Sequence, residues 1–171
     1  MAETPRLTRV PNWRPVLTQY IMAMQHTKFD WDPSQPNTIN CLTYMCNAIR
    51  AQTGRDVYGE VAKLTKLGYT SRDAAYQAID QIFGSDDIEG VLDQFFESKS
   101  IVSAVIGDVG IAEVNGIKAC AVVMNPLAYV KTLTGEFLNI SPLQLIKVYD
   151  PLSFAIPDKY LLTHLPPAGN A

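Results

Sequence analysis

Apolar residues recur at helical spacing through the first half of the chain. After a segment bounded by Pro5 and Pro11, the apolar positions of residues 13–24 predict a helix with Asn12 as its N-cap. Similar stripes predict helices at about residues 41–52, 57–67, 72–83 and 86–96. Gly54 and Gly84 are suited to end two of these helices, and Ser85 is the predicted N-cap of the last.

After Lys99 the pattern changes to short apolar runs rich in β-branched residues. Runs at residues 101–106, 110–114, 118–124 and 145–149 predict strands, and Asn115-Gly116 between two of them predicts a tight hairpin. Helices followed by an antiparallel meander indicate an α+β fold, with the helices packed on a small antiparallel sheet. We expect an N-terminal arm over residues 1–12, one domain over 13–150 and a proline-rich C-terminal arm over 151–171.

Composition and charge narrow the function classes. The 171 residues are 47% hydrophobic and 18% charged, which fits one globular domain. The net charge is −3 and the 14 Lys and Arg residues are scattered, so we expect no nucleic-acid partner. No apolar run approaches the roughly 18 residues that a membrane span requires. The first residues lack an apolar signal region, and we therefore expect synthesis in the cytoplasm.

Cys41 is the candidate site residue, because it begins the helix predicted at 41–52. A thiol in the first turn of a helix meets unpaired N–H groups and the positive end of the helix dipole, which both favour the thiolate. This is a favourable position for a nucleophilic cysteine. The alternative is a small buried side chain that fills the junction between helix and sheet, as free cysteines often do.

The other thiols predict no metal or redox centre. Cys46 lies on the apolar stripe of the same helix, and Cys120 lies in a predicted strand, so we expect both to be core residues. A Cys41–Cys46 disulfide is disfavoured because residues five apart in a helix do not face each other. With three cysteines in no framework spacing and only two histidines, we expect reduced thiols, no metal and no cofactor.

Four segments carry a resemblance when they are taken in order. They are the aromatic loop from Phe29 that leads into Asn40-Cys41-Leu42, the helix end Thr53-Gly54-Arg55-Asp56, the strand start Gly107-Asp108-Val109, and the hairpin Asn115-Gly116-Ile117-Lys118-Ala119-Cys120-Ala121-Val122-Val123. Together they resemble the NlpC-type papain-like cysteine peptidases, most closely the phage-tail and prophage subgroup. The resemblance spans roughly residues 13–150.

This resemblance implies a small α+β fold in which the nucleophile begins a helix packed on an antiparallel sheet. Members of the family cleave amide bonds in murein stem peptides, and phages carry such domains at their tail tips. The family's base histidine would fall near Lys118 or Ala119, and neither accepts a proton usefully at neutral pH. Some members of the tail-associated subgroup also lack this histidine. Asn40 stands where an Asp is frequent in the family.

The two histidines are alternative bases for Cys41. His26 follows the first predicted helix and precedes the loop that leads to Cys41, so it could reach the thiol from another direction. The simpler interpretation is a histidine that interacts with the last carbonyls of that helix. His164 lies in the proline-rich tail and could reach the site only if that tail folded back.

Acidic and aromatic residues offer weaker candidates. Asp30, Asp32 and Asp108 could pair as carboxylates for acid–base chemistry, although the first two suit a solvated turn around Trp31. Phe29 and Trp31 are interpreted as anchors of this loop rather than a substrate platform. A last acidic group is interpreted as charges at a helix start, with metal binding as the alternative: Asp86, Asp87 and Glu89.

We therefore predict a structural component of a phage tail tip or baseplate, built on a peptidase fold with lost or reduced catalysis. Its partners would be other tail proteins in a multi-copy assembly, and its location the virion tail. Two arms suited to gripping neighbours fit this role. One alternative is an active murein endopeptidase that uses Cys41 to open the cell wall during DNA delivery. A third possibility is a module that binds murein peptide without cutting it.

Overall fold

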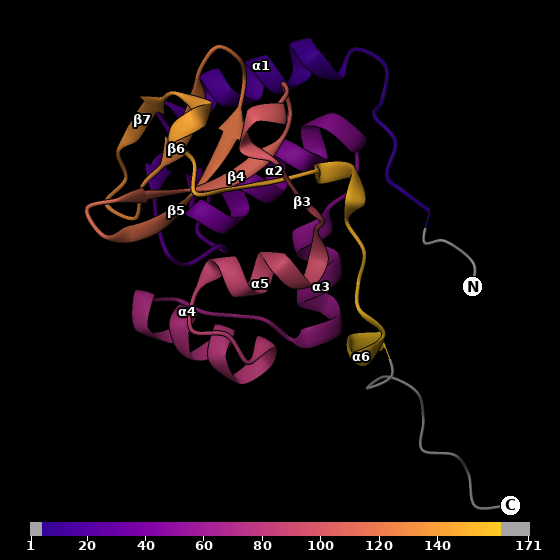
Figure 1. The fold of residues 1–171 in the computed structure, drawn as a ribbon. Helices are drawn as coiled ribbons and strands as arrows, with labels where there is room; N and C mark the ends of the chain where they lie inside the picture. The colour runs from indigo at the N-terminus through magenta and orange to yellow at the C-terminus, as the bar shows by residue number, and fades with distance from the viewer. Residues whose placement is uncertain (1–4, 162–171) are drawn as a thin grey trace, which may run out of the picture.

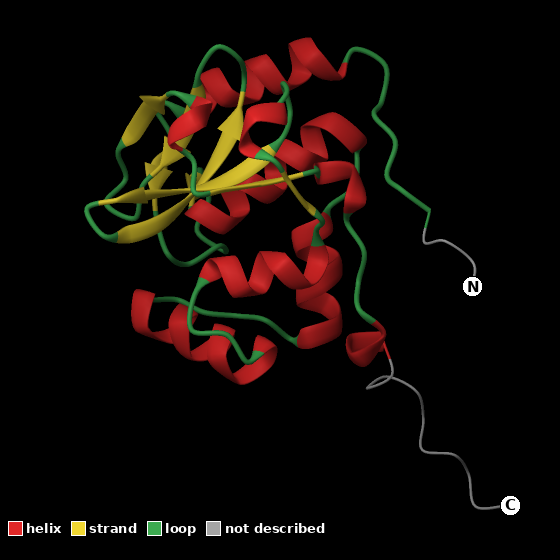
Figure 2. Cartoon of the chain, viewed as in Figure 1, coloured by secondary structure: helices red, strands yellow, loops and turns green. Residues whose placement is uncertain are grey.

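A six-stranded antiparallel sheet lies at the centre of the chain (Figures 1 and 2). The structure is a computed structural model and describes residues 5–161. The strands of the sheet are β3 (Ser98–Lys99), β4 (Val109–Val114), β5 (Ile117–Val123), β6 (Ala128–Lys131), β7 (Phe137–Ile140) and β8 (Lys147–Tyr149). Their order is β3-β8-β4-β5-β6-β7. A separate parallel pair joins β1 (Lys28–Phe29) to β2 (Thr38–Ile39).

The first five helices precede the main sheet in the sequence and the short α6 follows it, so the predicted α+β fold is confirmed. They are α1 (Trp13–Met24), α2 (Cys41–Thr53), α3 (Val57–Thr65), α4 (Arg72–Ala78), α5 (Ile88–Phe95) and the short α6 (Asp158–Leu161). A π-helical turn, Ile79–Phe83, extends α4. Figure 1 shows α1 at the top of the view and α3, α4 and α5 gathered at the bottom. Within residues 5–161, no helix has the length and apolar character needed to cross a membrane.

The two faces of the sheet carry two different cores. On the helical face, Cys120 and Val122 of β5 join the main core with residues of α1, α2 and α5. On the opposite face, Ala119 and Ala121 belong to a smaller core. Two 3-10 turns lie together beside this smaller core, η2 (Ile101–Ser103) and η3 (Pro142–Gln144). The alternation along β5 therefore decides which residues face the helices.

The β4–β5 hairpin turns at Asn115-Gly116 as predicted. Both residues have positive φ, 52° for Asn115 and 77° for Gly116, which is typical of the tight turn that matches the twist of paired strands. Val114 pairs with Ile117 across this turn. The hairpin fixes the register that brings Cys120 to the middle of the sheet.

The ends of α2 follow from local chemistry. The side chain of Asn40 accepts a hydrogen bond from the Thr43 N–H at 2.9 Å, and the Thr43 hydroxyl accepts one from the Asn40 N–H at 3.0 Å. This reciprocal capping begins the helix at Cys41. Gly54, with φ 73°, ends it one residue later than predicted. The apolar stripe predicted for this helix comprised Leu42, Met45, Cys46 and Ile49. Tyr44, which is not in that stripe, is fully buried, whereas Leu42 is only half-buried.

Two local predictions were wrong. Residues 101–106 form the 3-10 turn η2 and a loop rather than a strand, because the Asp108 carboxylate accepts a hydrogen bond from the Val105 N–H at 2.9 Å. The N-cap of α5 is Asp87, which accepts from the Gly90 N–H at 3.0 Å, and not Ser85. Asn12 is the N-cap of α1 as predicted, although its side chain makes no capping hydrogen bond.

The described parts of both arms pack on the domain. Leu7 is 8% exposed in the main core, and its N–H donates to the Leu152 carbonyl at 2.9 Å. Residues 5–11 are therefore held by the fold rather than free to grip a neighbour. Phe154 and Tyr160 pack on Phe95, with ring centroids 6.2 Å and 5.6 Å away. The rest of the predicted C-terminal arm, including His164, lies outside the described residues.

Candidate functional site

Cys41 is the first residue of α2 and lies against the sheet. Only 8% of the residue is exposed, and it belongs to the main core. The α2 helix is held in place by Gln52, whose amide donates to the Gly107 carbonyl at 2.8 Å. The sequence therefore predicted the place of Cys41 correctly, at the start of a helix packed on the sheet. Its position at the start of the helix fits a nucleophile, whereas its burial fits a core residue.

Among the groups that shift the pKa of the Cys41 thiol, Cys120 has the largest effect. A hydrogen bond from Cys120, together with the backbone N–H groups of Leu42, Cys120 and Cys41 itself, lowers the pKa of the Cys41 thiol, although burial opposes this shift. The same hydrogen bond and burial raise the pKa of Cys120. The two thiols thus shift in opposite directions, with the pKa of Cys41 lowered and the pKa of Cys120 raised. Cys46 differs, because burial raises its pKa and it is a core residue as predicted.

The positions expected for a base histidine serve other purposes. Lys118 lies on the same face of β5 as Cys120, but its ammonium pairs with Asp87 at 2.6 Å and with Glu89 at 2.7 Å. These hydrogen bonds raise the pKa of Lys118, so it is a charged partner of α5 and not a base. Ala119 belongs to the small core on the opposite face. The β5 residue that faces Cys41 is therefore Cys120, one position beyond the expected pair.

His26 is separated from Cys41 by the parallel pair of β1 and β2. Lys28 pairs with Thr38 and Phe29 with Ile39, so His26 precedes one end of the pair while Cys41 follows the other end. His26 is exposed, and it is not among the groups that shift the pKa of Cys41. Within residues 5–161, His26 is therefore not brought to the thiol, and the second candidate, His164, lies outside this range.

The Gly107-Asp108-Val109 segment is a structural junction. Asp108 is 2% exposed, and its carboxylate pairs with the Lys99 ammonium at 2.8 Å. Gly107 has φ 94°, and a side chain there would lie 2.2 Å from the Gln52 amide oxygen. The motif thus joins β4 to α2 and does not supply a carboxylate for acid–base chemistry.

The remaining acidic candidates also have local partners. Asp30 and Asp32 organise a turn, since the Asp30 carboxylate accepts from the Asp32 N–H at 2.9 Å and the Asp32 carboxylate accepts from the Ser34 N–H at 2.9 Å. Asp87 caps α5 and pairs with Lys118. No group of three potential metal ligands from His, Cys, Asp and Glu occurs in the part of the chain that the structure describes.

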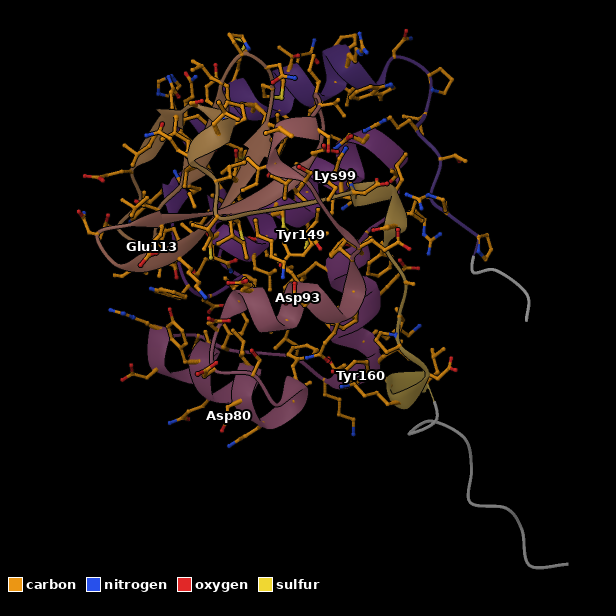
Figure 3. The ribbon with its side chains drawn as sticks, in the orientation of Figure 1. Asp80, Asp93, Lys99, Glu113, Tyr149 and Tyr160 are labelled. Atoms are coloured by element: carbon orange, nitrogen blue, oxygen red, sulfur yellow. The ribbon has the colours of Figure 1, made fainter. Side chains whose placement is uncertain are left out.

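Polar contacts of Asp93 also hold α5 on the sheet. Figure 3 shows Asp93 of α5 and Tyr149 of β8 facing each other, and the Tyr149 hydroxyl donates to the Asp93 carboxylate at 2.7 Å. The Lys147 ammonium pairs with the same carboxylate at 2.6 Å. With the Lys118 pairs, these contacts fix the helix that forms one wall of the space beside Cys41.

That space is an apolar cavity of about 420 Å³ between the start of α2, the helices α3 to α5 and the β4–β5 hairpin. Cys41 lies on its wall together with Asn40, Tyr58, Tyr69 and Trp31. If it were enclosed and empty, a cavity of this size would lower the free energy of unfolding by about 10 kcal/mol, at about 24 cal/mol per Å³. We therefore expect solvent or a ligand to occupy it.

Hydrogen bonds link Asn40 of the cavity wall to Tyr69 and Trp31. The Asn40 amide donates to the Tyr69 hydroxyl at 3.2 Å and to the Trp31 carbonyl at 3.4 Å. The Tyr58 hydroxyl is buried and forms no hydrogen bond. Burial raises the pKa of Tyr58, and the Tyr69 hydroxyl is near enough to oppose this rise without meeting hydrogen-bond geometry.

The model of the family described as "Domain of unknown function (DUF6950)" matches residues 8–149. The chain belongs to this family. No curated protein matches the chain. The matched residues of the DUF6950 domain include all three cysteines, the wall-lining tyrosines Tyr58, Tyr69 and Tyr76, and the whole β4–β5 hairpin.

Two features of the DUF6950 site were not predicted from the sequence. Cys120 was interpreted as a core residue, although the alternation of β5 already separates it from Ala119 and Ala121. The only sequence signal was that it shares a strand face with Lys118. Nothing in the sequence indicated the cavity, because its walls come from helices and a hairpin that lie far apart along the chain.

Proposed function

We propose that this DUF6950 chain is a structural component of a phage tail tip or baseplate, built on an NlpC-type peptidase fold with lost or reduced catalysis. The observation that carries the proposal lies on β5. The positions where the resemblance calls for a base histidine hold Lys118, whose ammonium pairs with Asp87 and Glu89, and Ala119, which belongs to the core on the opposite face. The link to phage tails rests on the resemblance of the sequence segments described above.

Hydrolysis of an amide bond needs more than a thiolate. The leaving nitrogen must receive a proton, and in a cysteine peptidase the imidazolium of the base histidine supplies it. Cys120 is a poor substitute because its pKa is raised, so it releases its proton reluctantly. General acid–base catalysis contributes roughly 10²–10⁴-fold to such a reaction. The exposed fraction of Cys41, 8%, also leaves little of it open to a peptide substrate.

The surface on the other side of the sheet supports an assembly role. Two adjoining turns, η2 and η3, and the residues after them carry exposed apolar side chains: Val102 at 81%, Leu143 at 68%, Val105 at 49% and Ile146 at 41%. Apolar side chains grouped on a surface are typical of protein contacts. We call these four residues the turn patch, and we propose that a neighbouring tail protein covers it.

An active murein endopeptidase is the second candidate. The lowered pKa of Cys41 and the cavity beside it favour this function, because a nucleophile needs both activation and space. It would require a base that reaches Cys41 from outside residues 5–161 or from another protein. A module that binds murein peptide without cutting it would need only the space.

Particles of the phage or prophage that encodes the chain provide the test. We expect mass spectrometry of purified particles to detect the chain, and we expect Cys41→Ala particles to assemble and deliver DNA like wild type. Leu143→Asp should reduce incorporation, because a charge in the turn patch opposes burial, whereas Glu113→Asp, at an exposed residue outside the patch, should not. Absence of the chain from particles would contradict the structural role. A Cys41→Ala variant that assembles but fails to deliver DNA would favour the endopeptidase.

A further inference from the structure

The two edge strands of the main sheet differ in how they are protected from pairing with another chain. At one edge, β3 has only two residues, and one of them, Lys99, is charged. A very short strand and a lysine are devices that keep an edge from pairing. At the other edge, β7 is Phe137-Leu138-Asn139-Ile140, which contains no charge and no proline. The β7 edge therefore lacks these devices.

The backbone of β7 alternates between β6 and the outside of the sheet. The Thr132 N–H donates to the Glu136 carbonyl at 2.9 Å, and β6 and β7 keep this register along their length. Because hydrogen-bonded pairs alternate in antiparallel strands, Leu138 bonds to β6, whereas the N–H and C=O groups of Phe137 and Asn139 point outward. Figure 1 shows β7 on the outside of β6, and no other described strand pairs with it.

The side chains of β7 are held on both faces of the sheet. The Phe137 ring packs on the helical face, with ring centroids 6.1 Å from Tyr44 and 5.6 Å from Tyr129. Leu138 and Ile140 pack against the smaller core on the opposite face. What the edge offers to a partner is therefore its backbone, as a fixed row of donors and acceptors. An extended polypeptide strand is the ligand that fits such a row.

A second copy of β7 satisfies all four outward groups. About a two-fold axis beside Leu138, Phe137 of each copy pairs with Asn139 of the other, and each pair exchanges two hydrogen bonds. Leu138 then lies opposite the partner's Leu138, and Glu136 lies opposite the partner's Ile140. No like charges are directly opposite each other, an arrangement that would destabilise paired strands. The strand is thus complementary to itself in hydrogen bonding and in charge.

We propose that two copies of this chain associate through antiparallel pairing of β7, which joins their sheets into one continuous sheet. The side chains of Leu138 and Ile140 then extend the smaller core across the two-fold axis. A pairing of four residues covers less surface than a standard stable interface, so the dimer is weak and forms at high protein concentration. The pairing does not depend on the proposed role in a phage tail, since it needs only this chain.

Sedimentation of the full chain over a concentration series tests the association. We expect the wild type to shift from monomer toward dimer as its concentration rises. Asn139→Pro removes one outward N–H from each copy and no bond to β6, so it should weaken the association about 5- to 150-fold, at about 2- to 12-fold for each of two hydrogen bonds. Asn139→Ala keeps this N–H and should associate like the wild type. Circular dichroism would verify that each variant is folded.

Disulfide formation tests the register of the pairing. Leu138→Cys would face its own copy in a non-hydrogen-bonded pair, where the Cα atoms are about 4.5 Å apart and a disulfide fits. Oxidation should therefore give a covalent dimer on a non-reducing gel. Ile140→Cys is the matched control, because the two substituted residues would be offset by about 14 Å along the strands. Wild type, whose cysteines at 41, 46 and 120 are buried, should give no covalent dimer.

Three results would overturn the proposal. The first is a wild type that remains monomeric up to its solubility limit. The second is a folded Asn139→Pro variant that associates as strongly as the wild type, which would remove the β7 backbone from the contact. The third is equal yields of covalent dimer from Leu138→Cys and Ile140→Cys. The disulfide pair keeps the test decisive if Asn139→Pro does not fold.

Discussion

The contact between Gly107 and Gln52 determines how α2 sits on the sheet, and Gly107→Ala tests it. The φ angle of Gly107 is 94°, a conformation that a residue with a side chain adopts only with strain. A Cβ at this position would lie 2.2 Å from the Gln52 amide oxygen. Gln52 cannot move aside freely, because it is fully buried and its amide donates to the Gly107 carbonyl at 2.8 Å.

The expected loss of stability has two parts. Positive φ costs about 1–2 kcal/mol for an alanine. Displacing Gln52 also disturbs its hydrogen bonds to the Gly107 and Ala48 carbonyls and the one that it accepts from Arg9, at about 1 kcal/mol each. We therefore expect Gly107→Ala to lower the free energy of unfolding by about 3–5 kcal/mol, the sum of strain and two to three weakened hydrogen bonds.

Gly116→Ala is the matched control. Gly116 also has positive φ, 77°, but a Cβ there would meet nothing within 4 Å. Urea unfolding should therefore give a loss of only about 1–2 kcal/mol for this variant, from strain alone. Equal losses for the two variants would refute the reasoning, because the contact with Gln52 would then add nothing.

Three further predictions concern the thiols, the ion pairs and the N-terminal segment. Cys120→Ala removes the hydrogen bond that lowers the pKa of Cys41, so the pH midpoint for iodoacetamide labelling of Cys41, measured by peptide mass spectrometry, should rise; an unchanged midpoint would count against this partner. Lys118→Ala should lower the free energy of unfolding by about 0.5–1 kcal/mol at neutral pH. Burial raises the pKa of Asp87, but hydrogen bonds from Lys118 and the backbone outweigh this effect and bring the pKa below 3.8. The stabilisation of the fold by the Asp87–Lys118 pair is therefore present above pH 3.8 and is lost as Asp87 becomes protonated in acid. Urea unfolding of wild type and Lys118→Ala should accordingly converge at about pH 2, and a difference that persisted there would contradict the assignment. Leu7→Ala should lower the free energy of unfolding by about 2–3 kcal/mol because Leu7 is a core residue, whereas Leu143→Ala, at an exposed residue, should change it by less than about 0.5 kcal/mol; equal effects would contradict the packed segment.

Elements governed by local chemistry were predictable from the sequence. The start of α2 at Cys41 and the Asn115-Gly116 turn need only neighbouring residues, so both were predicted at the right positions. The strand predicted at 101–106 failed because Asp108 captures the Val105 N–H, a contact that apolar periodicity does not reveal.

Features that depend on distant parts of the chain were missed. Strand β6 contains Lys131, which is 1% exposed and donates to the Thr27 carbonyl at 2.7 Å, so its burial depends on the end of α1. The partnership of Cys120 with Cys41 depends on the register between α2 and β5. The alternation of side chains along β5 places Cys120 and Ala119 on opposite faces of the sheet. It does not indicate which residue on the helical face of β5 affects the Cys41 thiol.

Turnover of purified murein sacculi tests the central claim most directly. Wild type and Cys41→Ala would be incubated with sacculi, and released peptides would be measured by mass spectrometry, with an active cysteine endopeptidase as positive control. We predict no release above background by either protein, because Lys118 and Ala119 stand where the resemblance calls for a base histidine. Release by wild type that disappears in Cys41→Ala would contradict the account and identify the domain as an endopeptidase.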